Sequence, residues 1–236
     1  MKLLNILLET QNSSIESSIE EEDDSSLEGA QKKIQEYIKN RYKGNFRLLN
    51  APVETLPKNF RVEGSLTLWD CGIKYLPKGL KIGGDLIIAN SGEQKFEELP
   101  SGLEVGGDVV VVGTKIKKIP EDIKLTARRR KLELSDNQIE LLPNNFYVNG
   151  DLILRNNPIK ELPKGLVARY LDLRNTQITE LPPDLVAHIL DASNTPLKHI
   201  PKTTRIIRSV NLENTPFSKR YDDDIFRILK ALKLRK

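Results

Sequence analysis

The chain is poor in the residue types that most often carry out chemistry. Its 236 residues include one cysteine, two histidines, one tryptophan and one methionine. A single cysteine excludes an internal disulfide and a cysteine-based zinc site. Two histidines leave little material for a metal centre or a general base. We find no catalytic constellation, and we therefore expect no enzymatic activity, no metal and no cofactor.

Long hydrophobic runs are absent as well. No stretch approaches the roughly 20 apolar residues that span a bilayer, so we expect no membrane span. The chain starts with a short apolar run, Leu3 to Leu8, which Asn5 interrupts and Glu9 ends. A secretory signal has about 7–15 apolar residues and a small-residue cleavage site. We therefore favour the cytoplasm or a virion over secretion, and we expect this run to dock on a partner or on its own domain.

The net charge of +4 hides an asymmetry. Residues 1–24 hold seven acidic residues and one lysine, net −6, so residues 25–236 carry net +10. The part from residue 10 to residue 24 is rich in serine and acids. This composition buries little apolar surface and predicts a flexible acidic N-terminal segment over residues 1–24.

A repeat dominates the rest of the sequence. Leu-Pro or Ile-Pro pairs recur at intervals of 20, 23, 20, 23, 20, 19 and 19 residues. The pairs end at Pro57, Pro77, Pro100, Pro120, Pro143, Pro163, Pro182 and Pro201. A fixed period of this length indicates a solenoid, in which each repeat forms one coil.

Between the proline pairs an alternating L-x-L pattern returns, and its clearest copy reads L-x-L-x-x-T-x-I-x-x-L-P from Leu171 to Pro182. Because side chains alternate along a strand, both leucines are expected to point into a core. The first inward row is Phe46, Leu66, Leu86, Val109, Leu132, Leu152, Leu171, Leu190 and Val210. The second is Leu48, Leu68, Ile88, Val111, Leu134, Leu154, Leu173, Ala192 and Leu212. The two rows predict nine coils.

Small and polar residues follow each strand. The first position is nearly uniform, and we interpret it as a ladder of amides that bond from coil to coil: Asn50, Asp70, Asn90, Gly113, Asp136, Asn156, Asn175, Asn194 and Asn214. The next position, for example Cys71, Asn137 or Thr176, is expected to bond the backbone where the chain leaves the strand. Glycines such as those of IGGD and VGGD precede the strands, where we expect the backbone to bend sharply.

These residues carry a family resemblance. The repeat resembles the short, 20-residue leucine-rich repeat with LP that is found in bacterial and phage proteins, over about residues 46–217. The motifs VNGDLIL and LRNTQI resemble repeat proteins of bacteria and large tailed phages. The resemblance implies an α+β repeat solenoid, a right-handed coil with about nine short parallel strands, and a protein-binding role. Some relatives carry a ubiquitin-ligase domain with a catalytic cysteine, but Cys71 lies inside the repeat, so we do not expect that activity here.

A solenoid needs a cap at each end. Residues 25–45 are predicted to form a helical cap, with Ser25 and Glu28 as a capping box. Apolar residues at helical spacing also predict a helical cap over residues 218–236, in which Asp222 to Asp224 precede Ile225 and the chain ends in basic residues. The solenoid itself then covers residues 46–217.

The outward strand positions are the candidate binding surface, because the strand face of a solenoid is usually its binding face. We expect exposed apolar side chains in the N-terminal half and polar ones in the C-terminal half. The predicted partner-binding residues are Trp69, Ile87, Val110, Val112, Arg155, Tyr170, Asp172, Arg174 and Asp191.

The sequence leaves three functions open. The leading one is a non-catalytic protein-interaction module. The second is a structural part of a virion or surface assembly. The third is weak binding of nucleic acid or another anionic surface through the basic C-terminal helix and a basic insert, Arg128, Arg129, Arg130 and Lys131. We do not expect specific nucleic-acid binding, because no aromatic platform interleaves these basic residues. The sequence names neither the partner nor the oligomeric state.

Overall fold

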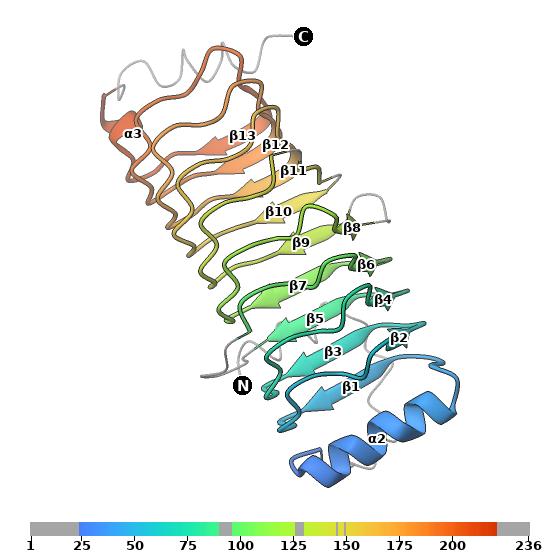
Figure 1. Ribbon diagram of the computed structural model, residues 1–236. Helices are drawn as coiled ribbons and strands as arrows, with labels where there is room; N and C mark the ends of the chain where they lie inside the picture. Colours follow the sequence, from blue (N-terminus) through green and yellow to red (C-terminus); the bar gives the residue numbers. More distant parts are fainter. Residues whose placement is uncertain (1–23, 90–95, 126–129, 145, 149, 221–236) are drawn as a thin grey trace.

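Nine short parallel strands stack into one sheet and form a parallel β-solenoid (Figure 1). This computed structural model describes residues 24–89, 96–125, 130–144, 146–148 and 150–220. The sheet runs in chain order through β1 (Phe46–Leu49), β3 (Leu66–Trp69), β5 (Leu86–Ala89), β7 (Val109–Val112), β9 (Lys131–Glu133), β10 (Asp151–Ile153), β11 (Val167–Asp172), β12 (Val186–Asp191) and β13 (Arg205–Asn211). The prediction of a repeat coil with about nine parallel strands is confirmed.

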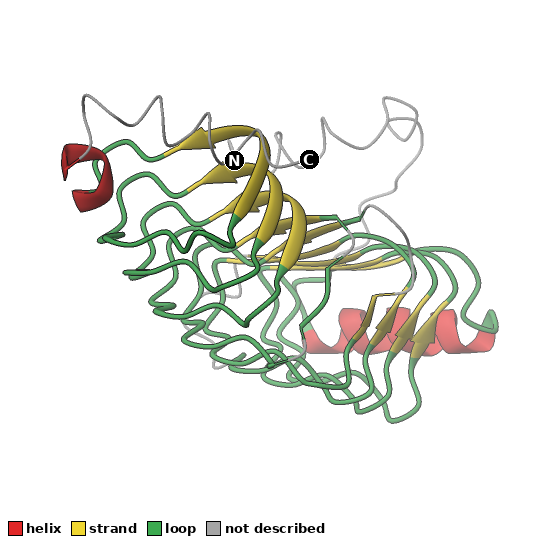
Figure 2. Cartoon of the chain, turned by 90° about the horizontal axis from the view of Figure 1, so that it is seen from above, coloured by secondary structure: helices red, strands yellow, loops and turns green. Residues whose placement is uncertain are grey.

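The inward rows follow the register of this sheet. Cross-strand partners run from Phe46 through Leu66 and Leu86 to Val210, in the order in which the sequence places them. All nine members of the second row, from Leu48 to Leu212, are at most 5% exposed. The core is thus one continuous column of apolar layers, with strands on one side and loops on the other (Figure 2).

A second, four-stranded sheet runs beside the first coils, and the sequence analysis did not predict it. It consists of β2 (Arg61–Val62), β4 (Lys81–Ile82), β6 (Glu104–Val105) and β8 (Lys124–Leu125). In the first three of these coils a glycine-containing corner separates the short strand from the main one, β2 from β3, β4 from β5 and β6 from β7. In β11, β12 and β13, where this corner is absent, one longer strand of six or seven residues replaces the pair.

The glycines at these corners allow neighbouring coils to stack closely. A Cβ atom on Gly83 would lie 2.1 Å from the Glu63 carbonyl oxygen, and one on Gly106 would lie 2.1 Å from that of Gly83. Neither glycine has a positive φ. Both nevertheless lie in the bend between the short strand and the main strand, so the expected bend is confirmed. Glycine is needed there because its missing Cβ lets neighbouring coils approach each other.

Side chains also link the corners from coil to coil. The Asn45 Oδ1 atom accepts from the Ser65 N–H, and Ser65 Oγ accepts from the Asp85 N–H. Asp85 Oδ1 then accepts from the Asp108 N–H at 2.7 Å, and Asp108 Oδ1 accepts from the Lys131 N–H at 2.9 Å. These bonds explain why the glycines precede an aspartate, which supplies the acceptor for the next coil.

Each described residue of the Asn, Asp and Gly column, which here means all of them but Asn90, adopts a left-handed conformation. Its φ is 50° at Asp70, 65° at Gly113 and 55° at Asn175. Asparagine, aspartate and glycine take this conformation more readily than other residues, which accounts for the uniform column. The predicted amide ladder is present in part: Asn156 Nδ2 donates to Asp136 Oδ1 at 2.7 Å, and Asn175 Nδ2 donates to Asn156 Oδ1 at 2.8 Å.

The buried residue that follows the column donates hydrogen bonds to backbone carbonyl oxygens of the turn, as expected. Asn137 Nδ2 donates to the carbonyl oxygens of Val111, Leu134 and Ser135, and Thr176 Oγ1 donates to that of Leu173 at 2.7 Å. These side chains replace the backbone partners that the chain loses as it leaves the strand.

Helix α2 (Leu27–Lys39) covers the first coil (Figure 1). Its N-cap is Ser26, whose side chain accepts from the Gly29 N–H, so the predicted cap at Ser25 is wrong by one residue. The helix buries Ala30, Ile34 and Tyr37, and the Tyr37 ring lies 4.7 Å from that of Phe46. The contact closes the apolar end of the column.

Helix α3 (Pro216–Arg220) lies at the other end of the coil, where Phe217 is 6% exposed. The predicted C-terminal cap over residues 218–236 falls mostly outside the described residues, and so does the predicted flexible segment, apart from Asp24.

Candidate functional site

Eight of the nine predicted partner-binding residues lie in two outward rows along the main sheet, and Tyr170 lies in β11 two residues before Asp172. Cross-strand pairing aligns the first row, which reads Arg47, Thr67, Ile87, Val110, Glu133, Ile153, Asp172, Asp191 and Asn211. In the second row, Leu49, Trp69, Ala89 and Val112 are aligned in the same way. The sheet therefore brings the predicted side chains onto one surface, although not all of them are accessible.

The apolar half of this surface is partly closed. Trp69 and Ile87 are half-buried, but Val110 is 3% exposed, Val112 is 5% exposed and Ala89 is 1% exposed. The expectation that the two valines are exposed is therefore wrong. Trp69 and Ile87 are therefore more accessible on this half than the two valines.

The polar half contains an organised charge cluster. The Asp172 carboxylate is 1% exposed, and it accepts from Arg174 Nε at 2.9 Å and from Arg174 Nη2 at 2.6 Å. It also accepts from the Arg174 N–H at 3.1 Å and from the Tyr170 hydroxyl at 3.4 Å. Two contacts to one guanidinium fix the planar group in a single orientation.

Asp191 completes this cluster. Its Oδ2 atom lies 3.9 Å from Arg174 Nε and accepts from Asn211 Nδ2, while its Oδ1 atom accepts from the Ser193 N–H and hydroxyl. Hydrogen bonding to the Asp172 carboxylate raises the pKa of Arg174, and burial, followed by the charge of Asp172, raises the pKa of Tyr170. Tyr170 therefore stays a neutral hydroxyl at physiological pH, beside a permanent cation.

Arg155 stands on the neighbouring coil. Its Nη2 atom lies 3.5 Å from Glu133 Oε1, and the side chain is 35% exposed. Asp172 is the only member of the predicted polar group that is fully buried. It contributes to the surface only by orienting the Arg174 guanidinium. Arg155, Tyr170, Arg174 and Asp191 keep partly accessible side chains.

The predicted basic insert does not form one described cluster. Lys131 Nζ pairs with Glu133 Oε2 at 3.0 Å on the strand face. Arg130 is exposed, and Arg128 and Arg129 lie outside the described residues. Lys131 is thus already paired with a carboxylate of the chain itself.

The residue types that could support catalysis are scattered. Cys71 is 2% exposed, its thiol donates to the carbonyl oxygens of Leu48 and Trp69, and burial raises its pKa to about 11. His188 is exposed, and His199 Nε2 lies 3.8 Å from Glu180 Oε1. Within the described ranges, no three His, Cys, Asp or Glu side chains are grouped so that they could hold a metal ion.

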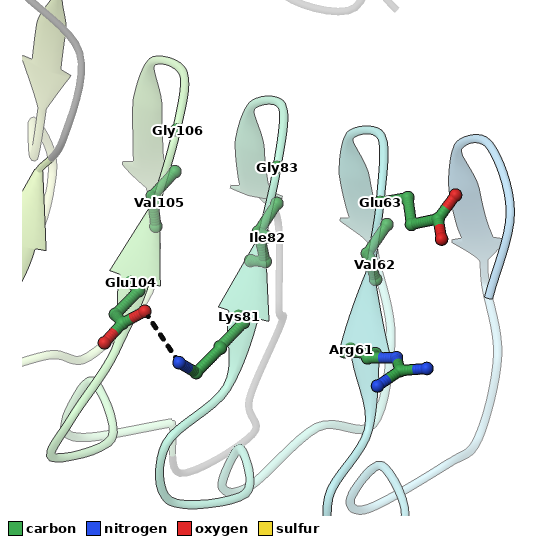
Figure 3. A pocket seen from close by; sticks show the side chains of 9 residues that line it. All are labelled: Arg61, Val62, Glu63, Lys81, Ile82, Gly83, Glu104, Val105 and Gly106. Carbon is green, nitrogen blue, oxygen red and sulfur yellow. Dashed lines mark ion pairs between the residues drawn. The ribbon is translucent and has the colours of Figure 1, made fainter.

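A shallow groove of about 300 Å³ runs along the second sheet (Figure 3). Gly83 and Gly106 lie along it, and Lys81 Nζ pairs across it with Glu104 Oε2 at 3.0 Å. Hydrogen bonds from Lys81 and Lys124 lower the pKa of Glu104. The groove follows from the glycines that coil stacking requires, and two of the charged side chains that line it, Lys81 and Glu104, are paired with each other.

No described helix is both long and apolar enough to cross a membrane. The chain matches no protein-family model, and no curated protein is similar to it.

Proposed function

We propose that the chain is a non-catalytic protein-interaction module of the leucine-rich-repeat type. Its partner binds the strand face, and the polar half of this face carries the main contact. The repeat period, the LP pairs and the parallel sheet support the repeat type. The supporting observation for the site is the Asp172–Arg174 pair, in which a buried carboxylate holds a partly exposed guanidinium in a fixed orientation.

Preorganisation is what favours this half. An arginine whose orientation is already fixed loses little side-chain entropy when it binds a carboxylate of a partner. Tyr170 and Arg155 lie on the same surface, and tyrosine and arginine are the residue types that most often dominate interface energies. Asp191 and the exposed Asn211 and Glu213 add acceptors beside them. A partner surface that offers both carboxylates and hydrogen-bond donors fits this arrangement.

Site-specific photo-crosslinking tests the assignment. A photoreactive phenylalanine replaces Tyr170 in one variant and Tyr75 in a matched control, because Tyr75 is an exposed tyrosine outside the main strands. We expect a discrete crosslinked protein from position 170 and none from position 75. Arg155→Ala in the same background should weaken the crosslink, while Lys117→Ala should leave it unchanged. A crosslink from position 75 alone would place the partner elsewhere.

A further inference from the structure

A group of exposed apolar side chains lies on the last coils of the solenoid, beside the strand face. We name this group the outer patch, and it consists of Tyr147, Val167, Val186 and Ile207. Six large apolar side chains are strongly exposed in the part of the chain that the structure describes, and three of them are Tyr147 at 65%, Ile207 at 45% and Val167 at 40%. The neighbouring Ala168, Ala187 and Ile206 are at most 2% exposed, so alternation points the outer patch away from the core.

The same position of each coil is charged at the other end of the solenoid. The fourth residue after the proline of each Leu-Pro or Ile-Pro pair is Arg61, Lys81, Glu104, Lys124, Tyr147, Val167, Val186 or Arg205. Strand pairing aligns the first four of these residues with one another, and it aligns the last three in the same way. The coil therefore accepts a charged residue where Tyr147 and Val167 stand. Exposed apolar side chains that the fold does not require indicate a contact surface.

The last strands bend between the outer patch and the strand face. Ala168 and Leu171 of β11 both point into the core. The two residues between them, Arg169 and Tyr170, both lie outside it. Figure 2 shows the resulting curvature of β11, β12 and β13. The outer patch and the charge cluster around Asp172 therefore belong to two adjoining surfaces, which two different partners can occupy at the same time.

The surroundings of the outer patch are basic. Residues 163–169, 182–188 and 201–208 carry most of it, and they contain one acidic residue and five exposed basic residues, which are Lys164, Arg169, Lys202, Arg205 and Arg208. The acidic residue, Asp184, lies 3.8 Å from Lys164 Nζ, and Asp151 pairs with Arg169. Two acidic residues against five basic ones leave a net positive charge. Two copies of the chain would bring like charges together here, so symmetric self-association is disfavoured.

The size of the outer patch distinguishes between the remaining partners. A stable protein–protein interface uses about 20–30 residues on each side, far more than the four apolar and five basic residues present here. An anionic bilayer needs fewer contacts, because each basic residue close to its surface raises the affinity about fivefold. Apolar side chains that enter the headgroup region add to this gain, and tyrosine is favoured at that depth.

We propose that the outer patch binds the surface of an anionic lipid bilayer. Tyr147, Val167 and Ile207 enter the headgroup region, and the surrounding arginines and lysines contact the phosphates and carboxylates of the lipids. The contact is peripheral and reversible. Because it lies beside the strand face, it brings a bound protein partner to the membrane surface. This last step rests on the proposed function, whereas the lipid contact itself does not.

Vesicle co-sedimentation of the full chain tests the proposal. The probe is vesicles of phosphatidylcholine with about one-third phosphatidylserine, beside vesicles of phosphatidylcholine alone. We expect the unmodified chain to bind the anionic vesicles and not the neutral ones, and about 0.5 M salt to weaken this binding strongly. Val167→Ser with Ile207→Ser should lower the affinity at least about fivefold, because two apolar contacts are lost. Circular dichroism confirms that each variant is folded.

Matched controls separate the outer patch from the rest of the surface. Tyr75→Ser with Leu141→Ser changes two other exposed apolar side chains and should leave the affinity unchanged. Arg208→Glu and Lys58→Glu each reverse one exposed positive charge, in the last coil and near the first one. Arg208→Glu should lower the affinity at least about fivefold, whereas Lys58→Glu should have little effect. Arg155→Ala, on the strand face, should also leave vesicle binding unchanged.

Three results would overturn the proposal. The first is that the unmodified chain does not bind the anionic vesicles, or binds the neutral ones equally well. The second is vesicle binding that Lys230→Glu with Lys233→Glu abolishes and Val167→Ser with Ile207→Ser does not, since the C-terminal segment would then be the contact. The third is patch-dependent binding to soluble polyglutamate or duplex DNA without binding to vesicles, which would make the partner a soluble polyanion. None of these readouts requires the protein partner, so the lipid contact and the proposed function can fail independently.

Discussion

Asp172 and Arg174 form a bidentate ion pair in which the carboxylate is 1% exposed and the arginine side chain is 36% exposed. The two residues occupy adjacent outward positions of one coil, so the pair requires no long-range adjustment. A buried carboxylate is tolerated only when it is paired and hydrogen-bonded. Arg174 therefore contributes to stability as well as to the exposed surface.

Arg174→Ala should destabilise the fold measurably, because it leaves the Asp172 carboxylate buried with only the backbone N–H and the Tyr170 hydroxyl as donors. We expect a loss of about 2–3 kcal/mol in the free energy of unfolding. Lys81→Ala is the control, since it breaks an ion pair of which the lysine side chain is 65% exposed, and it should cost less than about 1 kcal/mol. Urea denaturation of the two variants checks the prediction. Equal losses would show that the Asp172–Arg174 pair is energetically a surface pair.

At Asn175 the two explanations of the Asn, Asp and Gly column can be tested separately. One is the side-chain hydrogen bond to the neighbouring coil, and the other is the left-handed backbone. Its φ is 55°, and its side chain donates to Asn156. Asn175→Gly and Asn175→Ala both remove the side-chain bond, but only alanine opposes the left-handed backbone. We expect the alanine variant to be about 1–2 kcal/mol less stable than the glycine variant. Gln177 has no positive φ and serves as the control position, where glycine should be the less stable of the two. Glycine offering no advantage at position 175 would contradict the backbone explanation.

The period and the alternation were sufficient to predict the solenoid, both inward rows and the outward surface. The reason is that an L-x-L pattern has one consistent burial pattern in a stack of coils, and a slip of one residue would expose every leucine. The uniform column of Asn, Asp and Gly also indicates its own backbone conformation, because these three residue types adopt the left-handed conformation more readily than others. The column was predicted to form side-chain hydrogen bonds from coil to coil, and its left-handed conformation was not predicted.

Other features depend on three-dimensional proximity that a single sequence does not contain. The glycines at the corners are explained by a neighbouring carbonyl that lies 20 or more residues away in the chain. Val110 and Val112 are buried, although alternation placed them outward and therefore predicted exposure. Tyr170, Asp172 and Arg174 were placed on one face, but burial of the carboxylate, which organises the cluster, became visible only in the structure.

Gly83 should be far less tolerant of substitution than another glycine of the same coil. A Cβ at Gly83 would lie 2.1 Å from the Glu63 carbonyl oxygen, while one at Gly79 would have nothing within 4 Å. Gly83→Ala should therefore force neighbouring coils apart and cost about 3 kcal/mol. Gly79→Ala, which meets only the strain of a positive φ, should cost about 1 kcal/mol. Thermal denaturation of both variants decides this, and a reversed order would refute the stacking role of Gly83.

Cys71 should make the stability of the fold depend on alkaline pH. Burial raises the pKa of its thiol to about 11, above the value of about 8.5 that is expected in the unfolded chain. A raised pKa in the folded state means that the unfolded state loses its proton first. The contribution is thus complete below about pH 8.5 and is lost as the pH rises towards 11. The loss should reach about 3 kcal/mol at most.

The Cys71→Ala variant isolates this contribution, because tyrosines and lysines titrate in the same range and their effects cancel in the comparison with the unmodified chain. Alanine occupies the equivalent position at residue 51, where it is 1% exposed, so the substitution fits the turn. In urea denaturation from about pH 7 to 11, we expect the stability difference to move in favour of Cys71→Ala above about pH 9. We also expect the thiol of the folded chain to resist an aromatic disulfide reagent at about pH 8. A pH-independent difference, or rapid reaction without unfolding, would show that the thiol is not held as a buried, protonated donor to Leu48 and Trp69.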